Sequence, residues 1–152
     1  MKTLLCAVGR IKPGPEKVLF DHYAGRLSTP LDVVEVVEKR KLPTLELRAS
    51  EADLLSTKIP PGSVVIVFDE KGKEIDSRGL ASLVEGWKDS GIGTLALVIG
   101  GADGVHEKLL RRADKIISLG RMTWPHMLVR GLIAEQLFRA QCILSNHPYH
   151  RD

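Results

Sequence analysis

The chain has 152 residues, of which 43% are hydrophobic, and a formal net charge of +3 at pH 7. This length fits one domain with a core of its own, and the small positive charge permits a polyanionic partner while excluding a densely basic nucleic-acid coat. No segment approaches the length of an apolar membrane span, and residues 1–9 are too short an apolar stretch for a signal peptide, so we expect a cytoplasmic protein.

Short apolar runs recur along the chain, each bounded by glycine, proline or charged residues. Their length and β-branched content are typical of buried strands, which we expect at residues 4–8, 33–37, 64–68, 95–99 and 116–118. Helical patterns follow these runs, at residues 15–27, 44–57, 77–90, 105–113 and 127–145. Ser77 and Gly91 match the residues preferred at the two ends of a helix. The alternation predicts an α/β fold with a mainly parallel sheet and flanking helices, formed by residues 1–152 as one domain.

Several kinds of site find no support in the residue spacing. The two cysteines, Cys6 and Cys142, lie far apart, and we expect both to be buried thiols in a reducing cytosol. No cluster of histidine, cysteine and carboxylate residues has metal-ligand spacing, so no metal is expected. The chain also lacks a Gly-x-Ser-x-Gly elbow, a Walker lysine, and a Gly-x-Gly-x-x-Gly turn after the first strand, which argues against a hydrolase or an ordinary nucleotide site.

Two loops that join a predicted strand to a predicted helix are candidates for ligand binding. The first is glycine-rich, at residues 100–104, and lets backbone amides approach a ligand, although such a turn can need glycine for its geometry alone. The second covers residues 119–126, where Met122 and Trp124 would make a soft pocket for an adenine ring or a thioether. The alternative for these two side chains is a hydrophobic plug over the core. In α/β sheets, ligands collect at such carboxyl ends of strands.

The last predicted helix, residues 127–145, carries apolar side chains on more than one face. Such a helix is either central in its own chain or packed against another subunit, and we favour a homodimer interface over the intramolecular alternative. The apolar residues are Leu128, Val129, Leu132, Ile133, Leu137, Phe138, Ile143 and Leu144.

The same helix carries Glu135 and Arg139, which are four residues apart and share a face. An exposed ion pair and the polar wall of an active site are equally consistent with this spacing. The chain then ends with residues 146–152, which gather two imidazoles, a phenol and a guanidinium. These groups suit acid-base chemistry and anion binding, and the alternative is a solvated basic tail.

Four segments form a combination that is far more specific than any one of them. They are Ile99-Gly100-Gly101-Ala102-Asp103-Gly104, the stretch from Trp124-Pro125-His126 to Leu128-Val129-Arg130, Ala134-Glu135-Gln136-Leu137-Phe138-Arg139-Ala140, and Asn146-His147-Pro148-Tyr149-His150-Arg151. Together they resemble the RlmH family, small SPOUT-class methyltransferases that act on a pseudouridine in large-subunit ribosomal RNA. The likeness runs over the whole length of the chain.

The resemblance implies a SPOUT-type C-terminal trefoil knot, which composition alone does not indicate. It also implies a homodimer that takes a methyl group from S-adenosyl-L-methionine and methylates N3 of a pseudouridine in 23S ribosomal RNA, with the ribosome as partner. In the family, three loops surround the cofactor. The cofactor-binding residues implied here are Phe68, Gly100, Gly101, Gly120, Arg121, Met122, Thr123, Trp124 and Pro125.

The catalytic residues that the resemblance implies lie on the last helix and the tail. We expect His150 or Glu135 to accept or relay the N3 proton, and Arg151 or Arg139 to stabilise negative charge on the neighbouring carbonyl oxygens. Tyr149 would stack on the flipped base or orient it. The tail of one subunit would reach the cofactor pocket of the other. A non-catalytic ribosome-binding or assembly factor is the alternative, and it would have no need of a cofactor pocket.

Overall fold

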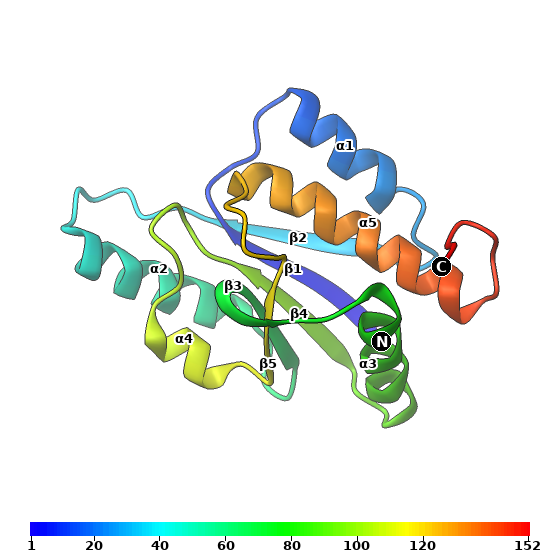
Figure 1. The fold of residues 1–152 in the computed structure, drawn as a ribbon. Helices are drawn as coiled ribbons and strands as arrows, with labels where there is room; N and C mark the ends of the chain where they lie inside the picture. The colour runs from blue at the N-terminus through cyan, green and yellow to red at the C-terminus, as the bar shows by residue number, and fades with distance from the viewer.

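The computed structural model describes residues 1–152 and alternates strands with helices along the whole chain (Figure 1). The strands are β1 (Lys2–Val8), β2 (Leu31–Val36), β3 (Val64–Glu74), β4 (Thr94–Ile99) and β5 (Lys115–Ser118). The helices are α1 (Pro15–Ala24), α2 (Thr44–Lys58), α3 (Ser77–Asp89), α4 (Glu107–Arg112) and α5 (His126–Leu144). Every strand and helix predicted from the sequence is present, so the α/β class is confirmed. None of the helices combines the length and the apolar character that crossing a membrane requires.

The five strands form one parallel sheet in the order β2-β1-β4-β3-β5. Helices α1, α3 and α5 cover one face with an apolar core, and α2 and α4 cover the other face with a second core (Figure 1). Because both faces are covered, the buried parts of the central strands are continuous apolar runs, which is why they stand out in the sequence. Cys6 and Cys142 are both buried, as expected, and burial raises the pKa of the Cys6 thiol to about 11.

The start of α3 differs from the predicted one. The sequence predicts Ser77 as the cap, but the Oδ1 atom of Asp76 accepts a hydrogen bond from the Gly79 amide at 2.7 Å and takes that role. Ser77 is the first residue of the helix, and its hydroxyl donates instead to the Gln136 Oε1 atom on α5 at 2.7 Å. Ser77 thereby links α3 to α5.

Strand β3 continues to Glu74, beyond the predicted end at residue 68, because its chain crosses over β5. Ile117 of β5 pairs first with Phe68 and then, on the far side of the crossing, with Lys73. A Cβ atom on Gly72 would lie 2.6 Å from the backbone N and C atoms of Ile117, so only glycine fits at the crossing. Figure 1 shows the segment sweeping across β5 toward α3. The trefoil knot itself stays a prediction.

Helix α5 is central in its own chain, lying over the sheet between α1 and α3 (Figure 1). A Cβ atom on Gly131 would lie 2.8 Å from the Leu19 Cδ2 atom, so glycine permits α1 and α5 to pack closely. Side chains such as Ile133 and Phe138 are buried within the monomer. The intramolecular alternative therefore accounts for much of the apolar surface of this helix, and the homodimer stays a prediction.

The beginning of α5 is tied to the ends of β1 and β2 by a buried ion pair. The Arg130 side chain is 1% exposed, and its Nη1 atom lies 2.6 Å from the Glu35 Oε2 atom. Its Nη2 group donates to the carbonyl oxygens of Val8 and Gly9. Burial alone would raise the pKa of Glu35, but hydrogen bonds from Arg130 and the Ile11 amide lower it below its ordinary value. These contacts fix α5 against the carboxyl end of β1.

Candidate functional site

A cavity of about 320 Å³ opens where β4, β5 and the apolar half of β3 end, at the carboxyl edge of the sheet. Its walls are residues 68–70 in the middle of β3, the glycine turn after β4, and the loop between β5 and α5; we call it the turn cavity. Pro125 does not line it and instead precedes the first residue of α5. The other predicted cofactor-binding residues all line it: Phe68, Gly100, Gly101, Gly120, Arg121, Met122, Thr123 and Trp124.

The glycines around the turn cavity have different physical roles. A Cβ atom on Gly100 would lie 2.6 Å from the Val105 Cγ2 atom, so the packing of the turn itself excludes a side chain there. Gly104 and Gly120 have φ angles of +85° and +105°, which L side chains rarely adopt. A Cβ atom at Gly120 would meet no atom within 4 Å. Gly120 thus leaves open space at the cavity wall, whereas Gly100 shapes the turn.

Negative charge dominates the lining of the turn cavity. The carboxylates of Asp69, Glu70 and Asp103 line it together with one guanidinium, that of Arg121. They do not form a metal centre, because no group of three or more His, Cys, Asp or Glu side chains is arranged to hold an ion. A lining of this charge complements a cationic ligand. Asp69 and Glu70 are absent from the prediction, although their place directly after the apolar half of β3 could have indicated them.

Met122 and Trp124 lie at the surface of the loop before α5, with exposed fractions of 74% and 40%. The Trp124 indole donates a hydrogen bond to the Leu119 carbonyl oxygen at 3.2 Å, which holds the ring over the loop. Neither side chain is a plug over the core, so that alternative is wrong for both. They are instead available to a ligand.

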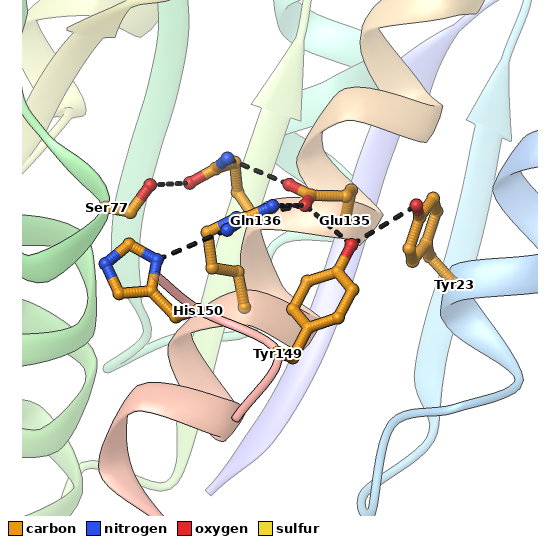
Figure 2. A network of polar contacts seen from close by, with 7 residues as sticks. Tyr23, Ser77, Glu135, Gln136, Tyr149 and His150 are labelled. Carbon is orange, nitrogen blue, oxygen red and sulfur yellow. Dashed lines mark hydrogen bonds and ion pairs between the residues drawn. The ribbon is translucent and has the colours of Figure 1, made fainter. Parts of the chain in front are cut away.

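Figure 2 shows a second polar site, built on the middle of α5 and the tail. The Glu135 Oε1 atom accepts hydrogen bonds from Arg139 Nε at 3.0 Å, from Arg139 Nη2 at 2.5 Å, and from the Tyr149 hydroxyl at 2.9 Å. The Glu135 and Arg139 side chains are only 17% and 24% exposed, so they are no ordinary surface ion pair. Burial, followed by hydrogen bonds with Tyr23 and Glu135, raises the pKa of Tyr149 above its usual range.

His150 also joins this site, whereas Arg151 does not. The His150 Nδ1 atom lies 3.2 Å from Arg139 Nη1, and its Nε2 atom lies 3.2 Å from the Asp152 Oδ1 atom. Because a guanidinium can only donate, we assign Nδ1 as the acceptor and place the ring proton on Nε2. The Asp152 carboxylate in turn accepts two hydrogen bonds from the Arg78 guanidinium on α3. Arg151 is exposed and makes no hydrogen bond.

Sequence reasoning missed three members of this site. Tyr23 of α1 lies with its hydroxyl 3.3 Å from that of Tyr149. Gln136 donates to the Glu135 Oε2 atom at 2.8 Å and accepts from Ser77 of α3 (Figure 2). No local pattern could have indicated Tyr23 or Ser77, because the fold brings them from other helices. The tail network, as we call it, comprises Tyr23, Ser77, Glu135, Gln136, Arg139, Tyr149 and His150.

The turn cavity and the tail network are separate within one chain. None of the five predicted catalytic residues lines the turn cavity. Between the two sites lies a second cavity of about 400 Å³, which shares Phe68 and Trp124 with the turn cavity and is also lined by Glu135 and Gln136. The structure thus brings the predicted residues into two groups on either side of this second cavity.

Comparisons with known proteins identify the family. Residues 1–150 match the model of a family described as predicted SPOUT methyltransferase. The chain belongs to the SPOUT methyltransferase family. It is 54% identical to the ribosomal RNA large subunit methyltransferase H of Rhodospirillum rubrum and 52% identical to that of Paramagnetospirillum magneticum, over 99% of each chain in both cases.

Solved structures share the fold of this chain at low sequence identity. A probable methylase family protein from Haemophilus influenzae gives a TM-score of 0.62 at 14% identity, covering 99% of this chain and 70% of that one. A probable methyltransferase from Bordetella pertussis gives a TM-score of 0.58 at 14% identity, covering 91% and 95%. At such identities the likeness concerns the arrangement of strands and helices, and it agrees with the parallel sheet described above.

Proposed function

We propose that this SPOUT methyltransferase transfers a methyl group from S-adenosylmethionine to N3 of a pseudouridine in 23S ribosomal RNA, on the assembled ribosome and as a homodimer. The observation that carries the proposal is the full-length likeness, at 54% identity, to a ribosomal RNA large subunit methyltransferase H. The turn cavity supports it, since a ribosome-binding factor without catalytic activity has no need of a ligand cavity at the strand ends.

The turn cavity is the place where the residues fit the cofactor. When bound, S-adenosylmethionine supplies a methyl group on a positively charged sulfonium. The carboxylates of Asp69, Glu70 and Asp103 complement that charge, and the Trp124 ring offers an apolar surface to an adenine. The turn at Gly100 packs closely against Val105, and this packing holds the backbone groups of the turn at the cavity wall, where they meet the ligand.

The tail network supplies the groups that manage the N3 proton. N3 lies between two carbonyl groups and carries a proton at neutral pH, which must leave as the new carbon–nitrogen bond forms. The Glu135 carboxylate is already occupied by donors from Arg139, Tyr149 and Gln136, so its role is to hold Arg139. His150 then accepts the N3 proton at Nδ1, once the Arg139 guanidinium turns from that atom to a carbonyl oxygen of the base.

The separation of the two sites favours a partner subunit as the source of the tail. Val129 is the last residue of α5 that lines the turn cavity, and Glu135 comes six residues later, which corresponds to about 9 Å along a helix. Methyl transfer needs the reacting atoms about 3–3.5 Å apart. A tail network from one subunit that reaches the turn cavity of its partner brings the groups together without unwinding α5.

The test is transfer of labelled methyl from S-adenosylmethionine to ribosomes that lack the modification. A matched set of ribosomes that lacks the target pseudouridine is the control. We expect label at N3 of pseudouridine in the first set alone. Label elsewhere, or donor binding without transfer, would point to another RNA target, and the absence of both binding and transfer would favour the ribosome-binding factor.

A further inference from the structure

The tail of this chain does not stand free, because Tyr23 of α1 and Arg26, in the turn after α1, hold it. The Tyr23 hydroxyl lies 3.3 Å from the Tyr149 hydroxyl, and it has no other hydrogen-bond partner in the structure (Figure 2). The Arg26 guanidinium lies 4.1 Å from the ring centroid of Phe138 and 5.6 Å from that of Tyr149. Neither Tyr23 nor Arg26 has a place in the mechanism described above.

The direction of the hydrogen bonds shows what Tyr23 does. A phenol has one proton, and Tyr149 gives it to the Glu135 carboxylate at 2.9 Å. The 3.3 Å contact between the two hydroxyls must therefore be a hydrogen bond that Tyr23 donates to Tyr149. The result is a chain of hydroxyls that runs from α1 to the carboxylate holding Arg139.

The ring of Tyr23 packs against its neighbours, whereas its hydroxyl orients the polar groups of the tail network. The rings of Tyr149 and Phe138 meet edge-on at 4.9 Å, and the ring of Tyr23 lies 6.2 Å from Phe138, so a phenylalanine at position 23 would pack in the same way. Only the hydroxyl of Tyr23 acts on the polar atoms of the network. Its removal leaves the apolar contacts in place and takes away one donor.

We infer that Tyr23 is a positioning residue of the methyltransferase, which orients the Tyr149 hydroxyl and, through it, the Glu135–Arg139 pair. Arg26 assists by holding the Tyr149 ring against Phe138. The catalytic meaning of this inference rests on the proposed function, but the anchoring of the tail by α1 does not. Helix α1 thus sets the geometry of the tail, whichever subunit's cavity that tail serves.

Tyr23→Phe tests both the catalytic role of Tyr23 and the anchoring of the tail, because it removes the hydroxyl oxygen and leaves the ring in place. We expect kcat for ribosome methylation to fall about tenfold, since small misplacements of catalytic groups have effects of this order or larger, while KM for S-adenosylmethionine stays within about twofold. We also expect carboxypeptidase Y to release the tail residues several-fold faster than from the unmodified protein. Arg26→Met should behave similarly and Arg26→Lys should recover part of the loss, because a lysine keeps the cation but not the planar stack. Arg111→Met, in an exposed pair on α4, is the matched control and should change neither rate.

The outcomes are distinguishable. Faster tail release with a tenfold lower kcat supports the inference in full. If the unmodified protein methylates ribosomes and Tyr23→Phe keeps both its kcat and its tail-release rate, the inference is wrong while the proposed function stands. If the unmodified protein shows no transfer, the proposed function fails, and the tail-release rates alone decide whether α1 anchors the tail.

Discussion

The turn cavity and the tail network are built from different parts of the chain. The cavity takes its shape from the backbone at the carboxyl edge of three neighbouring strands, and at Gly100 the packing of the turn excludes a side chain. The network consists of side chains that four segments contribute: α1, α3, α5 and the tail. A site made of backbone is sensitive to added atoms, and a site made of side chains is sensitive to lost ones. The following changes test that difference.

The largest effect is expected where a backbone crossing admits no side chain at all. Gly72→Ala would place a methyl group 2.6 Å from the backbone of Ile117, which cannot move without breaking the pairing of β3 with β5. We expect the free energy of unfolding to fall by roughly 3 kcal/mol or more in urea titrations. Gly86→Ala on α3, where a Cβ meets nothing within 4 Å, is the control and should stabilise slightly. Equal effects of the two substitutions would show that the crossing is absent.

Loss of atoms from the tail network should act on turnover. Arg139→Ala leaves Glu135 without its two guanidinium bonds and His150 without its Nδ1 donor. We expect methyl transfer in single-turnover assays to fall by about 10²–10³, with calorimetric affinity for S-adenosylmethionine unchanged. Arg139→Lys should recover little of the methyl transfer, because an ammonium group cannot donate the paired hydrogen bonds of a planar guanidinium. A large loss of donor affinity would contradict the separation of the two sites.

Added atoms at the turn cavity should act on donor binding. Gly100→Ala puts a methyl group against the Val105 Cγ2 atom and the Gly104 carbonyl, and we expect affinity for S-adenosylmethionine to fall roughly tenfold as the turn is displaced. Val105→Ala removes the closer of these contacts. Calorimetry on the double variant should therefore show partial recovery, a coupling that independent sites would not give. If the effects of the two substitutions simply add, the loss of affinity in Gly100→Ala does not come from the contact with Val105.

The smallest effect concerns the buried carboxyl group of Glu51, beside the glycine turn after β4. Glu51 is 8% exposed, and burial, with Asp103 and Glu38 nearby, raises its pKa above the ordinary 4.5. Its ionisation therefore destabilises the fold, an effect that is absent below the unfolded pKa and grows as pH rises through the folded pKa. Glu51→Gln should raise the melting temperature at pH 7 by about 2–4 °C and leave it unchanged near pH 3. A gain of the same size at both pH values would show that the cause is not ionisation.

The difference between a site shaped by backbone and a site made of side chains also explains what could be predicted from the sequence. Strands such as β1 and β4 are buried on both faces, so their apolar runs mark them clearly. The turn cavity follows from glycines at strand ends, which sequence position reveals. The polar half of β3 does not stand out, because residues 69–74 cross β5 at the sheet edge and bury little.

The tail network was only half visible in the sequence. Glu135 and Arg139 share a helix face, and the family resemblance pointed to Tyr149 and His150. Tyr23 lies 126 residues before its partner, so only the packing of α1 against α5 brings the two hydroxyls together. Periodicity describes single elements and contains no information on such long-range pairs.

The central claim is that the tail of one subunit completes the turn cavity of its partner, and mixing two inactive variants tests it most directly. Gly120→Trp puts a bulky side chain on the lining of the cavity and strains the loop at its φ of +105°, and Arg139→Ala disables the network. If the subunits exchange tails, random pairing of equal amounts yields one complete site in each mixed dimer, and about a quarter of the normal methylation activity returns. If each chain uses its own tail, no mixed dimer contains a complete site, and the mixture stays as inactive as its parts.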